Sequence, residues 1–135
     1  MKTVKVVAAV IIDSEKVCIC QRKENDTFPL LWEFPGGSVE KEETLEEAIR
    51  REIKEELNLD IEPIKFLGKF EDTLDSLKID VHLFLSRIKK GMPSAQECAD
   101  FRFIMLEELD RFPLAPVDKK IASYLQSQRD LLFSM

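Results

Sequence analysis

Residues 32–61 read WEFPGGSVEKEETLEEAIRREIKEELNLDI, with ten acidic side chains against four basic ones. The pattern predicts a loop followed by a helix over residues 44–57. Thr44 with Glu47 three residues later is the capping-box pattern that begins a helix. Asn58 readily adopts the left-handed conformation that often ends one. This segment is the strongest structural signal in the chain.

The predicted helix is amphipathic, but its carboxylates are not all on the polar side. At about 100° per residue, the aliphatic side chains form one drifting stripe made of Leu45, Ile49, Ile53 and Leu57. Three carboxylates lie in this stripe or on its shoulder: Glu56 at about 20°, Glu52 at about 340° and Glu55 at about 280° from Leu45. Composition alone favours simple solvation of an acidic helix, but two of these positions are where leucines are expected.

A hard divalent cation is the alternative explanation for these carboxylates. Such an ion takes several carboxylate oxygens and leaves positions for water and phosphate. Gly36 and Gly37 precede the helix and allow a tight turn, so a backbone carbonyl can approach the same ion. Arg51, at about 240° on the helix, can pair with Glu55 or with an acid of the preceding loop.

The charge of the chain is concentrated in this region. The net charge is −6, and residues 38–62 alone hold ten acids and four bases. This balance argues against binding of duplex nucleic acid through a broad basic surface. Three cysteines, expected as buried free thiols, are typical of a reducing compartment. The N-terminal apolar run is too short for a membrane span, so we expect a cytoplasmic protein.

The remaining sequence combines strands with a late helix. Strands are predicted over residues 4–12, 17–22, 64–72, 77–88 and 101–106, a helical turn over 106–112 and a final helix over 118–128. Strands mixed with one early and one late helix predict an α/β chain of the α+β type, with a mixed β-sheet sandwiched between helices. A length of 135 residues fits one domain over residues 1–135, as a monomer or a homodimer.

The acidic segment resembles the signature of the Nudix hydrolases, G-x5-E-x7-R-E-U-x-E-E-x-G-U, where U is a bulky aliphatic residue. The matching positions are Gly37, Glu43, Arg51, Glu52, Ile53, Glu55, Glu56 and Leu59. Asn58 stands where the family has glycine, and it is the next best residue for a left-handed helix end. The stretches LWEFPGG and FPLAPVD extend the resemblance to the MutT-type branch and imply a Nudix fold over essentially the full chain.

The resemblance implies a set of roles for individual residues. Mg²⁺, with Mn²⁺ as a substitute, would be held by Glu52, Glu55, Glu56 and the carbonyl of Gly36. Glu43 and Arg51 would form an ion pair that braces the loop on the helix. Glu97 falls where MutT-type enzymes place a carboxylate that binds metal or acts as base, although an exposed loop glutamate explains it equally well. Arg22, Lys23 and Glu33 are candidates for substrate contacts, or else ordinary surface charges.

The activity implied is hydrolysis of a nucleoside triphosphate to the monophosphate and pyrophosphate. Oxidised dGTP is the first expected substrate, which would make the chain a sanitiser of the nucleotide pool and an aid to DNA repair. CTP and 5-substituted cytidine triphosphates are the alternative, and a non-catalytic nucleotide-binding module is the rival of another class. Asp118 either contacts the base or caps the last helix, and Phe34 and Phe84 either stack on a base or belong to the core.

Overall fold

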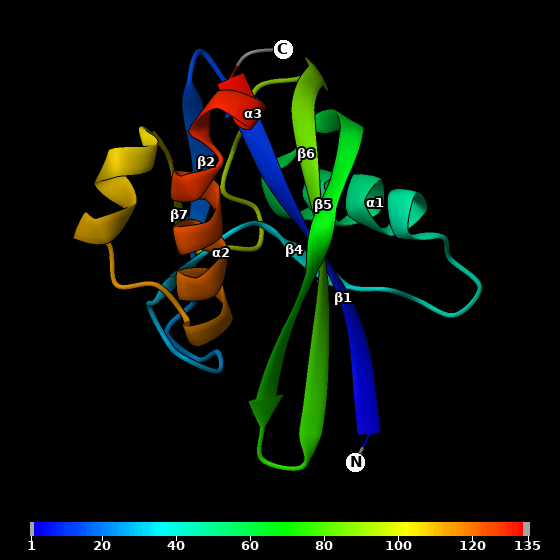
Figure 1. Cartoon of the computed structure of the whole chain (residues 1–135). Helices are drawn as coiled ribbons and strands as arrows, with labels where there is room; N and C mark the ends of the chain where they lie inside the picture. Colours follow the sequence, from blue (N-terminus) through cyan, green and yellow to red (C-terminus); the bar gives the residue numbers. More distant parts are fainter. Residues whose placement is uncertain (1, 134–135) are drawn as a thin grey trace.

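The computed structural model describes residues 2–133 and shows a mixed sheet with helices on both faces (Figure 1). The strands are β1 (Lys2–Asp13), β2 (Lys16–Gln21), β3 (Trp32–Glu33), β4 (Gly36–Ser38), β5 (Asp60–Leu74), β6 (Leu77–Lys90) and β7 (Asp100–Ile104). The helical segments are α1 (Leu45–Leu57), the 3₁₀ helix η1 (Leu106–Arg111), α2 (Pro116–Ser127) and α3 (Arg129–Phe133).

The sheet is built around β1, whose parallel partner is β6. Its central order is β3-β2-β1-β6-β5, with β4 added on β1 and β7 on β2. Among the six strand pairs of residues 2–133, β1–β6 is parallel and the other five are antiparallel. The expected mixed sheet of an α+β chain is therefore confirmed.

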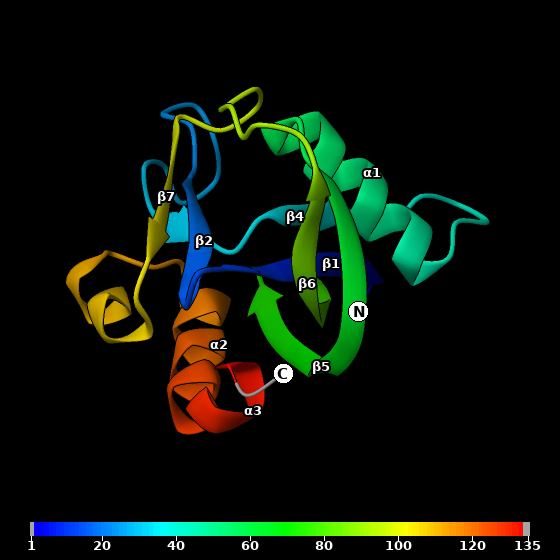
Figure 2. The same ribbon diagram turned by 90° about the horizontal axis from the view of Figure 1, so that it is seen from above.

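β1 separates two apolar clusters because it is buried on both faces. Val7, Ala9 and Ile11 point to the α1 side, where they pack with Ile49 and Ile53. On the other side, Ala8 and Val10 pack with side chains of α2 and η1. A strand covered on both faces has a continuous apolar run in place of an alternating one, as residues 6–12 do. Seen from above, the sheet lies between α1 on one side and α2 with α3 on the other (Figure 2).

Several element boundaries differ from the sequence prediction. The short strands β3 and β4 and the helix α3 were not predicted, because each has too few residues to show a period. The last long helix begins at Pro116 and not at residue 118, since proline suits the first turn of a helix. β5 starts at Asp60 and continues through Pro63 with three register irregularities along its pairing with β6.

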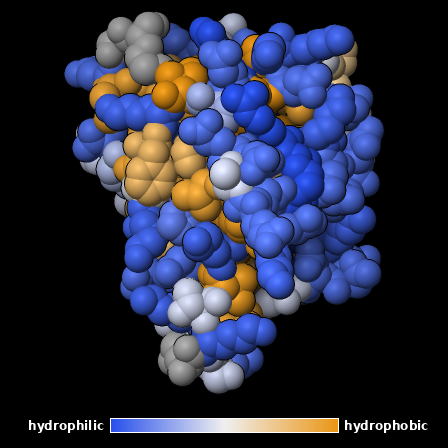
Figure 3. Space-filling view, turned by 90° about the vertical axis from the view of Figure 1, so that its right-hand side faces the viewer, coloured by the Kyte–Doolittle hydropathy of each residue, from blue (hydrophilic) through white to orange (hydrophobic). Residues whose placement is uncertain are grey.

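The surface in Figure 3 is mostly hydrophilic, with apolar side chains gathered in a broken band along the molecule. Large apolar side chains with substantial exposure are Leu30, Ile64, Phe66 and Met92. All three cysteines are buried and none forms a disulfide within the described residues. No helix in residues 2–133 is long and apolar enough to cross a membrane.

Candidate active site

Arg51 connects the acidic loop to the acidic helix. Its Nε and Nη2 donate to the two carboxylate oxygens of Glu43 at 2.7 and 2.9 Å. Its Nη1 donates to Glu52 at 2.9 Å and to Glu55 at 3.0 Å, and Nη2 also reaches the carbonyl oxygen of Ser38 at 3.0 Å. A bidentate arginine–carboxylate pair fixes direction as well as distance. Arg51 therefore holds loop, β4 and α1 in one arrangement.

The ends of α1 follow the local rules read from the sequence. Thr44 is the N-cap, and its hydroxyl accepts from the Glu47 N–H while the Glu47 carboxylate accepts from the Thr44 N–H, which completes the capping box. Asn58 ends the helix at φ 58° and ψ 35°, which is the left-handed region. The asparagine at the glycine position of the motif thus has the conformation that glycine favours.

The tight turn predicted at Gly36 and Gly37 is wrong. Their lack of a Cβ atom instead allows other groups to lie close to the backbone. Both lie in β4, paired with β1, and neither has a positive φ. A Cβ atom on Gly36 would lie 1.9 Å from the Val7 carbonyl oxygen. A Cβ atom on Gly37 would lie 2.1 Å from Oε1 of Glu52. The bare backbone of Gly37 therefore makes the space that the Glu52 carboxylate fills.

Glu56 is a buried carboxyl on the inner side of α1. Its side chain is 9% exposed, and Oε1 has no hydrogen-bond partner within the described residues. Burial, followed by the charge of Glu33, raises the pKa of Glu56 to about 9. Burial also raises the pKa of Glu52, against the opposing effect of Arg51. By contrast, the hydrogen bonds from Arg51 lower the pKa of Glu43 to about 2.

The donor set on α1 suits a hard divalent cation. Within residues 2–133, no three histidine, cysteine, aspartate or glutamate side chains already converge on one point. Glu52 and Glu55 are turned towards Arg51 instead. The side chains of these glutamates nevertheless offer oxygen donors. In the part of the chain that the structure describes, Glu56 Oε1 has no hydrogen-bond partner, and the Gly37 backbone leaves room for the Glu52 carboxylate. Such oxygen donors are the ligands that magnesium and manganese prefer.

The loop that carries Glu97 packs against the end of α1. The backbone N–H groups of Gln96 and Glu97 donate to the carbonyl oxygen of Glu56 at 3.0 and 3.4 Å. The side chain of Glu97 is exposed, and its negative charge contributes to the raised pKa of Glu52. The structure thus brings Glu97 to the acidic helix from a distant part of the chain.

Arg22 and Glu33 form a half-buried ion pair beside the helix carboxylates. The Arg22 guanidinium bonds to Glu33, to Asp26 and to the carbonyl oxygen of Thr27. Burial raises the pKa of Glu33, against the opposing charge of Arg22. Lys23 is exposed and does not line the adjoining cavity, so the structure separates it from Arg22.

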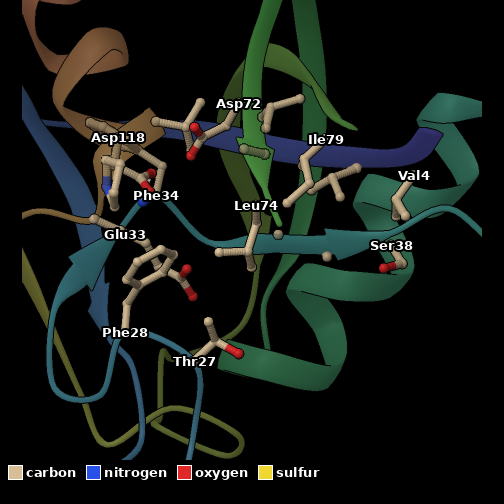
Figure 4. Close-up of a pocket in the computed structure, with 18 of the residues that line it drawn as sticks. Val4, Thr27, Phe28, Glu33, Phe34, Ser38, Asp72, Leu74, Ile79 and Asp118 are labelled. Carbon is tan, nitrogen blue, oxygen red and sulfur yellow. Dashed lines mark hydrogen bonds between the residues drawn. The ribbon is translucent and has the colours of Figure 1, made fainter. Parts of the chain in front are cut away.

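A cavity of about 340 Å³ opens next to these groups, and Asp118 lies in its wall (Figure 4). Asp118 is 5% exposed, and its Oδ1 accepts a 2.9 Å hydrogen bond from the Phe34 N–H. Burial, followed by the charge of Glu33, raises the pKa of Asp118 well above its ordinary value. The capping role considered for Asp118 is wrong, because Ala115 is the N-cap of α2 and Asp118 lies inside the first turn.

The two phenylalanines considered for base stacking lie in different places. Phe34 lines the cavity but is only 3% exposed. Phe84 lies on the α1 side of the sheet, in edge contact with Phe66 at 5.4 Å between ring centroids, and does not line this cavity. It lies on the wrong face of β6 to share a ligand with Asp118.

Sequence reasoning missed several residues of the cavity. Phe28, in the loop before β3, points into it, and Asp72, Leu74 and Ile79 enter it from the β5–β6 hairpin (Figure 4). The only sequence signal for Phe28 was an aromatic residue in an otherwise polar loop. The hairpin residues had no such signal, because their position depends on how β5 and β6 pair beside β1.

Comparison with known proteins identifies a family and several relatives with similar sequences. The NUDIX domain matches residues 2–125. The CTP pyrophosphohydrolase of Escherichia coli strain K12 is 31% identical over 118 residues, which is 87% of each chain. The 8-oxo-dGTP diphosphatase of Buchnera aphidicola subsp. Acyrthosiphon pisum is 34% identical over 108 residues, covering 78% of this chain and 84% of the relative.

Solved structures show the same architecture. The solution structure of the E. coli ORF135 protein superposes with a TM-score of 0.84 at 28% identity, over all of this chain and 96% of the other. The crystal structure of a MutT protein from Methanosarcina mazei Go1 also has a TM-score of 0.84, at 21% identity, over 94% and 95% of the two chains.

Proposed function

Because this chain belongs to the NUDIX family and is a pyrophosphohydrolase of the MutT type, we propose that it hydrolyses nucleoside triphosphates to monophosphates and pyrophosphate with Mg²⁺. The observation that supports this most strongly is the cavity of about 340 Å³ lined by Gly37, because the backbone of Gly37 also lies against the Glu52 carboxylate of α1. That cavity is lined by apolar walls and a few acidic groups, as small-molecule sites usually are.

Three glutamates of α1 would hold the cation. We assign Glu52, Glu55 and Glu56 to Mg²⁺, or to Mn²⁺ in its place, together with the carbonyl of Gly36. When bound, the ion neutralises the charge of the phosphate chain and makes water more acidic. Oε1 of Glu56, which has no partner among residues 2–133, supports this assignment, since a buried polar atom without a partner is costly unless a ligand satisfies it.

The other charged residues orient the substrate and move the proton. Arg51 positions Glu52 and Glu55 through its hydrogen bonds, and its pair with Glu43 keeps it in place. Glu97, exposed at the edge of this group, is our candidate for the carboxylate that accepts a proton from the attacking water. Arg22, beside the cavity, would contact a phosphate while Glu33 holds its guanidinium in position. No covalent nucleophile is needed.

For the base, we propose oxidised guanine, as in 8-oxo-dGTP. The name of the Buchnera relative supports this choice, and a buried Asp118 with a raised pKa can both donate and accept hydrogen bonds. CTP and its 5-substituted forms are the second candidate, supported by the E. coli relative at 31% identity. The unpaired thiols suit a reducing compartment, and we place the activity in the cytoplasm.

The test is pyrophosphate release from 8-oxo-dGTP, dGTP, CTP, 5-methyl-dCTP and ADP-ribose in magnesium. Glu56→Gln should abolish release, whereas Glu46→Gln, the same substitution on the exposed face of α1, should retain it. Activity that survives in Glu56→Gln would contradict the assigned cation site. Wild-type protein that releases nothing but melts at a higher temperature in magnesium would favour a non-catalytic nucleotide-binding module.

A further inference from the structure

The cavity contains a second aspartate, Asp72, which sequence reasoning did not single out. It lies near the end of β5, and its pairing partner on β6, Ile79, also lines the cavity. Figure 4 shows the Asp72 side chain directed from the hairpin towards the first turn of α2, on the side where Asp118 lies. Two carboxylates from distant elements therefore border one cavity.

One oxygen of Asp72 is available to a ligand. Oδ1 accepts a hydrogen bond from the Thr73 N–H at 2.9 Å, which restrains the side chain. Within residues 2–133, Oδ2 takes part in no hydrogen bond or ion pair, so a molecule in the cavity can bind to it. The residue is half-buried, which makes its hydrogen bonds stronger than those of a fully solvated carboxylate.

The other lining residues are mostly apolar, so the Asp72 carboxylate can distinguish one base edge from another. Phe28, Leu74, Ile79 and Val117 supply apolar surface suited to a flat ring. Among the described residues that line the cavity, Arg22 is the only cation, and it is already paired with Glu33. An ionised carboxylate only accepts hydrogen bonds. A base edge with an amino group can donate to it, whereas a carbonyl at the same position brings one acceptor against another.

We propose that Asp72 is a specificity-determining residue that selects bases with an amino group over their oxo or unsubstituted counterparts. The inference rests on the proposed nucleotide hydrolysis and adds a discriminating group to its base pocket. Guanine differs from hypoxanthine by an amino group alone, so this pair isolates the contact. Cytosine differs from uracil by an amino group in place of a carbonyl and by an unprotonated N3 in place of N3–H.

The test compares kcat/KM for CTP against UTP and for dGTP against dITP. In the pair that the wild type hydrolyses better, we expect the amino base to be preferred and Asp72→Asn to reduce this preference about tenfold. The asparagine retains an oxygen for the Thr73 N–H, so the hairpin should stay folded. The change should fall mainly on KM, since in this proposal Asp72 binds the base and not the phosphates.

Asp75→Asn is the matched control. Asp75 lies three residues further along the same hairpin, outside the cavity lining, at φ 55°, a conformation that asparagine tolerates. Its removal subtracts the same charge and should leave the base preference unchanged. A preference that persists in Asp72→Asn, or that falls equally in Asp75→Asn, overturns the proposal.

Binding of the monophosphates CMP, UMP, dGMP and dIMP, measured by calorimetry, separates this proposal from the enzymatic one. Binding that prefers the amino base in an Asp72-dependent way, without any triphosphate hydrolysis, would refute the proposed activity and support the role of Asp72. Hydrolysis without an Asp72-dependent preference would refute the role of Asp72 alone. A wild-type protein that neither hydrolyses nor binds these nucleotides would overturn both.

Discussion

Replacing Glu56 with glutamine should stabilise the metal-free protein at neutral and alkaline pH. Glu56 has an ordinary pKa of 4.5, which burial and the charge of Glu33 raise to about 9 in the folded protein. Between these values the unfolded chain has lost the proton and the folded chain retains it. The free energy of unfolding therefore falls as pH rises, by up to about 1.4 kcal/mol per pH unit.

The size of this effect follows from the pH range. From about pH 5.5 to about pH 8, the wild type should lose up to roughly 3 kcal/mol through Glu56. Glutamine has no proton to lose, so Glu56→Gln lacks this contribution. The buried amide of the glutamine changes the free energy of unfolding by an amount that does not depend on pH. The difference between variant and wild type should thus widen with pH in favour of the variant.

The assay is urea denaturation in a chelating buffer at several pH values, with Glu46→Gln as the control. Glu46 is exposed on the first turn of α1, so its replacement should leave the wild-type pH profile intact. Added magnesium should raise the midpoint of the wild type and not that of Glu56→Gln. Parallel pH profiles for Glu56→Gln and wild type would refute a buried, protonated Glu56.

Three further changes test other parts of the site. Gly37→Ala places a Cβ 2.1 Å from Oε1 of Glu52, so magnesium should no longer raise the melting temperature, while unfolding in chelator changes by only about 1 kcal/mol. Arg51→Lys cannot bind Glu43 through two parallel hydrogen bonds, so we expect at least tenfold lower kcat/KM, and a pKa of Glu43 nearer its ordinary 4.5 by NMR titration. Asn58→Ala forces alanine into the left-handed region and should lower the free energy of unfolding in urea by about 1 kcal/mol, whereas Asn58→Gly should change it little.

Local rules accounted for the helix that carries the carboxylates. Its start at Thr44, its end at Asn58 and its buried stripe depend on residues within four positions of one another, so the sequence contains them. The same azimuths placed Glu56 in the stripe, and the structure buries it. The tight turn predicted at the two glycines was wrong. The glycines instead make room for β1 and for Glu52, and no local sequence pattern encodes such contacts.

By itself, the sequence determined the α+β class, the family and the acidic helix, because each depends on short-range spacing of side chains. Only the tertiary structure decided what surrounds the base pocket. The pairing of β5 with β6 brings Asp72 to this pocket, and the packing of α2 brings Asp118 to it. The tertiary structure also shows that Phe84 lies on the α1 side of the sheet. Contacts between distant segments depend on strand register and layer packing, which are properties of the whole chain and not of any one stretch of it.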